Sequence, residues 1–162
     1  MVFKLSRFLA GFMIPVIVGG AILVRDSKEK LMTRVVYSEA ATQSELGREI
    51  VAKSILNRVK NKDYLSNVRD VVYQKNNFSC IGSNNWKESK FRIFRNDYEE
   101  RVFQECKQTV KNILRGKRLG IPREDEIIAH HDNSIEKPND RYWNTLEKVG
   151  EIGDFSVYAP KN

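Results

Sequence analysis

VVYSEAATQSELGREIVAKSILNRV, residues 35–59, joins a short apolar run, one acid, a polar turn and an amphipathic helix. Ser44 stands where the helix should begin, because its hydroxyl can accept a hydrogen bond from an unpaired amide of the first turn. Ordered segments on both sides of the turn should hold Glu39 in a fixed position. The apolar residues of the helix recur at a spacing that predicts one stripe facing a core: Leu46, Ile50, Val51, Ile55 and Val59.

Glu39 is the candidate catalytic residue of this stretch. A fixed and partly sheltered carboxyl group suits acid catalysis, because partial burial raises its pKa toward the working pH. The alternative is a solvated glutamate that merely ends a helix. The residue type alone does not separate these interpretations.

A second informative block, VVYQKNNFSC, lies at residues 71–80. Together the two blocks resemble the cell-wall hydrolase family typified by spore cortex-lytic enzymes, and the similarity extends over about residues 31–158. Three departures stand out: residues 41–43 replace the family's Arg-Gly-Glu, Asn77 replaces a Gln, and Phe155 replaces a His whose role cannot be carried over. The positions of the first block in register are Tyr37, Glu39, Ala40, Ser44, Gly47, Val51, Ala52, Leu56, Asn57 and Arg58.

The resemblance implies a lysozyme-like domain at residues 31–162, mainly α with a small strand element beside the cleft (an α+β fold). Residues 1–30 would precede it as a membrane or signal helix with its connector. The best-known relatives look like lytic transglycosylases, so the resemblance also implies peptidoglycan glycan strands as substrate and Glu39 as the catalytic acid.

Residues 76–86 are polar and aromatic without periodicity, which predicts a loop that lines a site. Phe78 and Trp86 would be costly on an ordinary surface loop, and aromatic rings in such a place suit stacking on sugars. The residues expected to bind substrate, from this loop and from the resemblance, are Tyr37, Asn77, Phe78, Ser79, Trp86, His131 and Tyr158.

Further elements follow from local patterns. Residues 27–32 should lead into a first helix that reaches Glu39, and residues 67–74 predict a short helix or extended piece with Val68, Val71, Val72 and Tyr73 inward. Residues 97–115 show the clearest later helix, with Tyr98 in its apolar stripe and Gly116 at its end. The remaining C-terminal part predicts short extended pieces and loops.

Residues 8–24 form a run of 17 uncharged residues. As a helix this run would span roughly 25 Å, just short of a bilayer core of about 30 Å. It could be a cleaved signal peptide, an uncleaved anchor, or, least in keeping with Pro15, a buried core helix. Its weak hydrophobicity also resembles the signal-arrest-release helices of some phage lysis enzymes. If the run is a signal peptide, an anchor or a signal-arrest-release helix, the domain is exported and works at the inner membrane, in the periplasm or in the wall.

The composition limits the kinds of partner and cofactor that the chain is expected to bind. The chain of 162 residues carries a formal net charge of +7, which suits an anionic polymer or an anionic membrane face. The basic residues are scattered without a run of five, so we expect no nucleic acid partner. Cys80 and Cys106 could form one bridge or remain two buried thiols. No Cys/His cluster has metal-ligand spacing, and we expect a monomer without metal or other cofactor.

A single acid constrains the chemistry. Ordinary glycoside hydrolysis uses two carboxylates, and the nearby Glu45 and Glu49 are not obvious partners for Glu39. A lytic transglycosylase needs only one, whereas a muramidase could use Asp132 as the second or a water held by Gln or Asn. A non-catalytic module that grips the wall, and a basic nucleic-acid binder, are the alternatives from other classes. A phage lysis enzyme and a bacterial wall-remodelling enzyme both suit such a chain.

Overall fold

Serine and asparagine side chains begin the main helices of the computed structural model, which describes residues 26–134, 137 and 141–161. The helices are α1 (Lys28–Ala40), α2 (Glu45–Lys60), α3 (Val68–Tyr73), α4 (Asn84–Phe91) and α5 (Asp97–Leu114). In each case the cap side chain accepts a hydrogen bond from a backbone amide of the first turn, which satisfies one of the groups that a helix start leaves unpaired. The cap residues are Ser27, Ser44, Asn67, Ser83 and Asn96.

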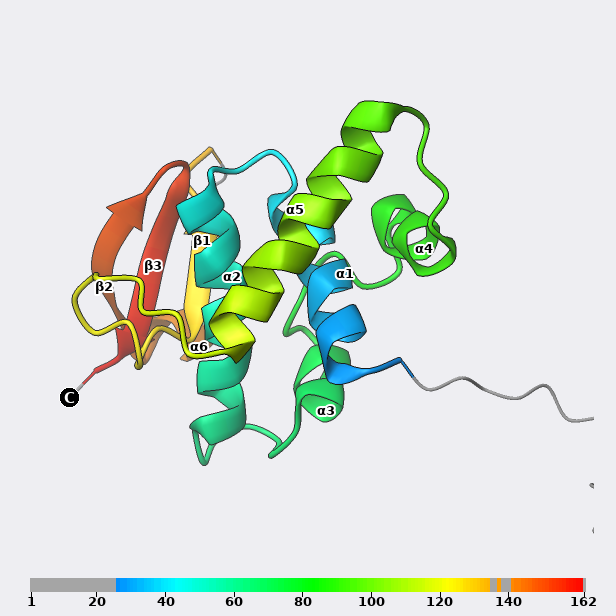
Figure 1. The fold of residues 1–162 in the computed structure, drawn as a ribbon. Helices are drawn as coiled ribbons and strands as arrows, with labels where there is room; N and C mark the ends of the chain where they lie inside the picture. Colours follow the sequence, from blue (N-terminus) through cyan, green and yellow to red (C-terminus); the bar gives the residue numbers. More distant parts are fainter. Residues whose placement is uncertain (1–25, 135–136, 138–140, 162) are drawn as a thin grey trace, which may run out of the picture.

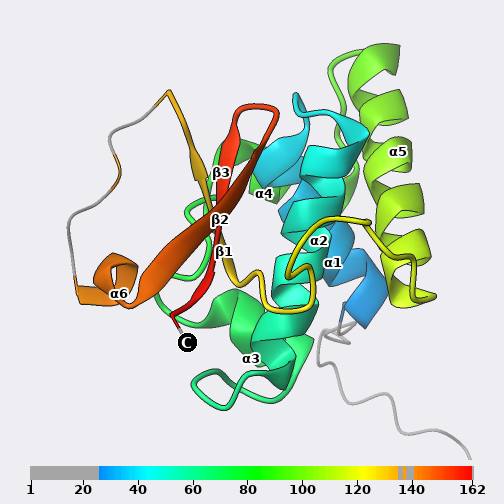
Figure 2. The same ribbon diagram turned by 90° about the vertical axis from the view of Figure 1, so that its left-hand side faces the viewer.

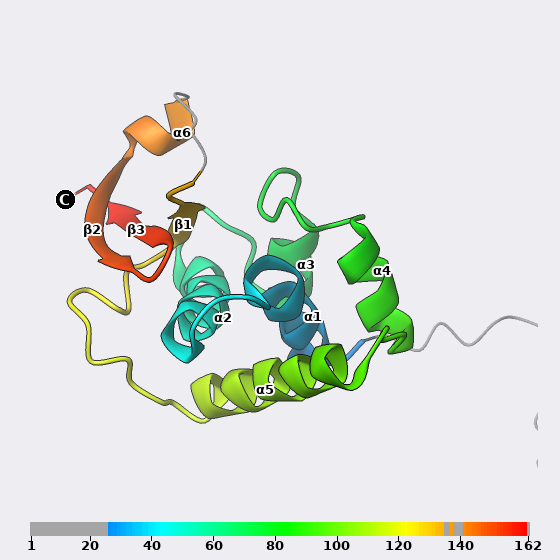
Figure 3. The same ribbon diagram turned by 90° about the horizontal axis from the view of Figure 1, so that it is seen from above.

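Helix α1 is the centre of the helical part. It contacts α2, α3, α4 and α5, and Figure 3 shows it enclosed between them. Its apolar residues leave almost no surface to solvent; Leu31, Met32, Val35 and Val36 are all buried. Because α1 is buried among four other helices, its end, with Glu39, is firmly placed.

An arginine is also buried on α1. The Arg34 guanidinium forms an ion pair with Asp26 at 2.7 Å, donates to the backbone oxygen of Trp86 at 3.0 Å, and lies 3.7 Å from the centre of the Trp86 ring. A buried charge is tolerated only when it is paired and hydrogen-bonded in this way. These contacts fix α4 against the start of α1.

A three-stranded antiparallel sheet forms the other side of the molecule (Figure 1). It consists of β1 (Ala129–Asp132), β2 (Leu146–Ile152) and β3 (Phe155–Pro160), and the short helix α6 (Arg141–Asn144) precedes β2. The strand order is β1-β3-β2, so β3 pairs with both neighbours (Figure 2). Phe155 and Val157 of β3 join the main core, which ties the sheet to the helices.

Most of the predicted helices are confirmed, and so is the mainly helical class with a small strand element. The first and second helices and the helix at residues 97–115 lie where the patterns placed them, and Gly116 follows the last of these with φ of 92°. Two inward assignments were wrong: Tyr98 is 57% exposed and Tyr73 is 46% exposed. Each lies at an end of its helix, where a helical stripe leaves the core.

Helices α4 and α6 were not predicted. The expected loop at residues 76–86 runs into α4, whose buried residues are only Trp86 and Ser89, too few to show a helical period. Helix α6 has four residues and none of them is buried. Local sequence therefore carried little signal for either element.

The two cysteines are free and both are buried, which excludes the bridge. The expectation for residues 8–24 lies outside the described part of the chain. Among the helices that the structure describes, none combines the length and the apolar character needed to cross a bilayer.

Candidate active site

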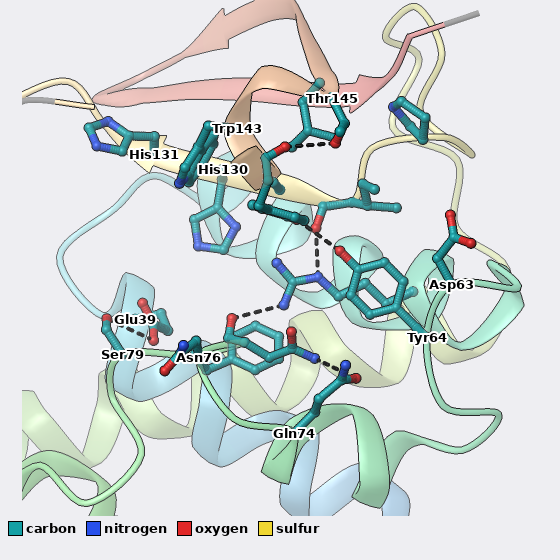
Figure 4. A pocket seen from close by; sticks show the side chains of 18 of the residues that line it. Glu39, Asp63, Tyr64, Gln74, Asn76, Ser79, His130, His131, Trp143 and Thr145 are labelled. Atoms are coloured by element: carbon teal, nitrogen blue, oxygen red, sulfur yellow. Dashed lines mark hydrogen bonds between the residues drawn. The ribbon is translucent and has the colours of Figure 1, made fainter. Parts of the chain in front are cut away.

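A cleft of about 1070 Å³ lies between the helical part and the sheet. Residues 74–79 and the end of α1 form one side, and residues 128–132 with α6 and the start of β2 form the other. In Figure 4, Glu39, Ser79 and Asn76 lie together on one side, with His130, His131 and Trp143 across from them. The cleft therefore joins parts of the chain that are far apart in sequence.

Glu39 is held by one of its two carboxylate oxygens. The backbone N–H of Cys80 donates to Oε1 at 2.9 Å, and the Ser79 hydroxyl lies 3.4 Å from the same oxygen. Within the described residues, Oε2 accepts no hydrogen bond. One fixed and one free oxygen is an arrangement that can present a proton to a bound substrate.

Cys80 positions this contact through its burial. Its side chain is 6% exposed and belongs to the main core, so the amide next to Glu39 cannot drift. Burial raises the pKa of the Cys80 thiol, and the neighbouring Glu39 carboxylate adds to the effect. Since only the thiolate is a good nucleophile, we assign Cys80 a structural role.

Arg58 joins the two sides of the cleft. Its Nε donates to the Ile128 backbone oxygen at 2.6 Å and its Nη1 donates to the Asn77 backbone oxygen at 2.9 Å. The guanidinium also lies 4.6 Å from the centre of the Phe78 ring. Arg58 was in register with the family's first block, but the sequence assigned it no function.

The histidines belong to the sheet side. The His130 ring lies 5.0 Å from the Phe155 ring, and its Nδ1 is buried without a hydrogen-bond partner among the described residues. Burial, together with the charge of Arg58, lowers the pKa of His130, so the ring is neutral at ordinary pH. The His131 ring stands edge-on to Trp143 at 5.6 Å. In the described part of the chain, no group of three or more His, Cys, Asp and Glu side chains could hold a metal.

Some predicted binding residues meet Glu39 in the cleft. Asn77, Phe78, Ser79 and His131 all line it. Asn77 is also tied down, because its Nδ2 donates to the Val71 backbone oxygen at 2.8 Å. Their part in substrate binding stays a prediction.

Three other predicted residues lie outside the lining of the cleft. Tyr37 packs against Phe103 at 5.4 Å between ring centres, and the Trp86 ring is covered by Arg34. Tyr158 is 6% exposed and packs behind Trp143 at 5.2 Å. These three rings are buried and none of them lines the cleft, and their part in substrate binding stays a prediction.

The residues at one end of the cleft were not predicted from the sequence. Tyr64, which follows α2, and Tyr142 of α6 share a hydrogen bond between their hydroxyls at 2.8 Å, and both line the cleft. Asp63 and Tyr64 lie at the end away from Glu39 (Figure 4). No local pattern would have paired residues 64 and 142, because their contact arises only when the sheet packs on the helices.

The candidates for a second carboxylate differ in position. Glu45 and Glu49 both contact Lys117 and do not line the cleft. Asp132 does line it, and hydrogen bonds from the Ser134 side chain and backbone lower the pKa of Asp132. An ionised carboxylate is thus present on the side opposite Glu39.

Comparison with known proteins supports the resemblance. The family model described as Cell Wall Hydrolase matches residues 42–158. The chain belongs to this family. The matched range begins just after Glu39, so the acid itself rests on the cleft geometry and on the block in register.

Two solved structures resemble this cell wall hydrolase. The catalytic domain of the Bacillus cereus SleB protein has a TM-score of 0.57 at 20% identity, over 86% of this chain and 98% of that one. The catalytic domain of the germination-specific lytic transglycosylase SleB from Bacillus anthracis has a TM-score of 0.57 at 18% identity, over 83% and 97%. At these identities the likeness shows a shared fold. A search of curated protein sequences gave no significant match.

Proposed function

We propose that this cell wall hydrolase cleaves the glycosidic bond between N-acetylmuramic acid and N-acetylglucosamine of peptidoglycan, as a lytic transglycosylase with Glu39 as the acid. One observation carries the proposal: Glu39 lies in a cleft with Oε1 held by Cys80 and Oε2 free. Membership of the family and the fold shared with a structure named as a lytic transglycosylase support the same reaction class.

The reaction needs a single carboxyl group. Protonated Glu39 gives its proton to the glycosidic oxygen, the bond to C1 breaks, and the leaving sugar departs with that proton. The Glu39 carboxylate then takes the proton of the muramyl 6-hydroxyl, whose oxygen closes on C1 to form a 1,6-anhydro ring. Glu39 ends protonated, and no water is consumed. The Cys80 amide keeps Oε1 in place during both transfers.

A muramidase is the second candidate, because Asp132 lines the same cleft and is ionised. In that reaction a second carboxylate would activate water or stabilise the sugar cation. The two mechanisms break the same bond but leave different ends on the muramic acid.

We predict 1,6-anhydro-muramic acid ends in the products. Mass spectrometry of muropeptides released from purified sacculi would detect them as species lighter by one water and resistant to borohydride reduction. The physical reason is the single acid held at the bond, which leaves the 6-hydroxyl as the nucleophile. Mainly reducing ends would instead favour the muramidase, and Asp132→Asn should then abolish the activity.

We further propose that the domain acts outside the cytoplasm, with residues 8–24 as the export element and the membrane contact. The phage-endolysin role belongs to the same proposal, with wall remodelling in a bacterium as the alternative setting.

We expect N-terminal sequencing of protein from the periplasm or lysate to show an intact Met1 in a soluble form, because the apolar run is short and weakly hydrophobic. An intact Met1 only in membranes would indicate a permanent anchor, and a start near residue 22 a cleaved signal. Protein confined to the cytoplasm would contradict export.

A further inference from the structure

A second depression, here called the side groove, adjoins the catalytic cleft. It has a volume of about 500 Å³, and all of its lining comes from residues 72–81. It shares with the cleft the residues Gln74, Lys75, Asn76, Phe78 and Ser79. Val72, Tyr73 and Ile81 line the side groove and not the cleft.

The side groove begins next to the catalytic acid. Ser79 lines both spaces, and its hydroxyl lies 3.4 Å from Glu39 Oε1. Ser79 therefore joins the lining of the side groove to the position of Glu39. Figure 4 shows Ser79 directly beside Glu39 at this edge of the cleft.

The segment between the two spaces is held in place. The Asn77 backbone N–H donates to the Gln74 oxygen at 3.1 Å, and the Asn77 oxygen accepts from Arg58 at 2.9 Å. Asn76 adopts a left-handed conformation with φ of 65°, which turns the chain between these contacts. The side groove is thus a built feature beside the cleft, with anchored walls.

Its chemistry differs from that of the cleft. The cleft is lined by the acids Glu39, Asp63 and Asp132, whereas no acid lines the side groove. Lys75 stands at the junction, exposed and without an ion pair among the described residues. Ile81 adds half-buried apolar lining over the fully buried Val72, and Tyr73 is 46% exposed with the Arg69 guanidinium 5.5 Å from its ring centre.

We propose that the side groove binds the stem peptide attached to the muramic acid at Glu39. This peptide leaves the sugar through its lactyl ether, on the same ring as the bond that is cleaved, and it carries small apolar side chains and free carboxylates. The apolar lining and the unpaired Lys75 ammonium complement both features. The inference rests on the proposed function, because it assumes that muramic acid is bound at Glu39.

The test compares two substrates for the full-length protein: glycan strands that carry stem peptides, and the same strands after an amidase has removed them. We expect a wild-type preference for the peptide-bearing strands. Tyr73→Ala should lower kcat/KM on these strands by about fivefold to tenfold, the order expected for loss of one aromatic contact. It should leave the stripped strands unaffected, because Tyr73 does not line the cleft.

Tyr98→Ala is the matched control. Tyr98 is also about half exposed, lies under an arginine at 5.3 Å, and lines neither space. It should change neither rate. Equal wild-type rates on both substrates, or a Tyr73→Ala loss that is the same on both or absent on both, would overturn the stem-peptide site. Failure of the proposed function is recognised separately, because the wild type would then cleave neither substrate.

A binding measurement on the wild type covers the case in which Tyr73→Ala does not fold. In an NMR titration, a muramyl tripeptide should shift the amides of Lys75 and Ile81, whereas N-acetylmuramic acid alone should leave Ile81 unchanged. The Tyr98 amide serves as the internal reference. An unshifted Ile81 with the muramyl tripeptide would overturn the proposal without any variant.

Discussion

Glu39→Gln is expected to lower the rate of wall lysis by roughly 10²–10⁴, the usual contribution of a positioned acid. The amide has nearly the shape of the carboxyl group, and its oxygen can still accept the hydrogen bond from the Cys80 backbone that now measures 2.9 Å. What it loses is the proton that the glycosidic oxygen must receive. Release of soluble muropeptides from purified sacculi measures the rate, and circular dichroism checks that the variant is folded.

Glu45→Gln is the matched control for this experiment. Glu45 is an exposed glutamate of α2 that contacts Lys117 and does not line the cleft. It should retain the wild-type rate. Full lysis by a folded Glu39→Gln protein would remove Glu39 from the mechanism. Wild-type protein that binds sacculi without releasing fragments would instead favour the non-catalytic binding module.

Arg58→Met is expected to have the second largest effect, on both stability and activity. The substitution leaves the backbone oxygens of Ile128 and Asn77 without the donors that reach them at 2.6 and 2.9 Å. An unsatisfied buried polar group costs about 1–3 kcal/mol, so we expect the free energy of unfolding to fall by about 3 kcal/mol. The two sides of the cleft would also lose their connection through Arg58. We therefore expect activity to fall even in buffer without urea, where the variant is still folded.

Urea unfolding and muropeptide release measure these two effects. Arg58→Lys should lie between the wild type and Arg58→Met, because one ammonium group cannot reproduce the fixed fork of the guanidinium. Arg101→Met is the control, since Arg101 is exposed and lies over Tyr98 away from the cleft. An Arg58→Met protein as stable and active as the wild type would show that the cleft does not depend on this connection.

The helices show how far the sequence alone could predict the fold. Helices α2 and α5 carry caps and repeated apolar positions, so their local sequence already contains the signal. In α4, by contrast, the burial of Trp86 is set by Arg34, which lies 52 positions earlier in the chain. The same long-range contact explains why Trp86 suggested a sugar platform and is instead part of the core.

The site was predictable on one side only. Glu39, Phe78 and Ser79 lie in two sequence blocks, and these blocks form the helical side of the cleft. The opposite side comes from the sheet, whose strands pair over long distances, and the Tyr64–Tyr142 contact depends on that pairing. Short-range patterns carry no information about contacts of this kind, so the sheet side, apart from His131 and Asp132, could not be derived.

The strand order has a consequence for the order in which the enzyme becomes active during its synthesis. Strands β1 and β2 do not pair with each other; each pairs with β3, which follows both in the chain. Helices α1 to α5 are all encoded by residue 114, whereas β1 and β2 have no partner strand until β3 has been made. Glu39 therefore lies in the part of the chain that is made first, and the second side of the cleft depends on the part that is made last. The second side of the cleft can form only once β3, which ends at Pro160, is free to pair with both of its neighbours.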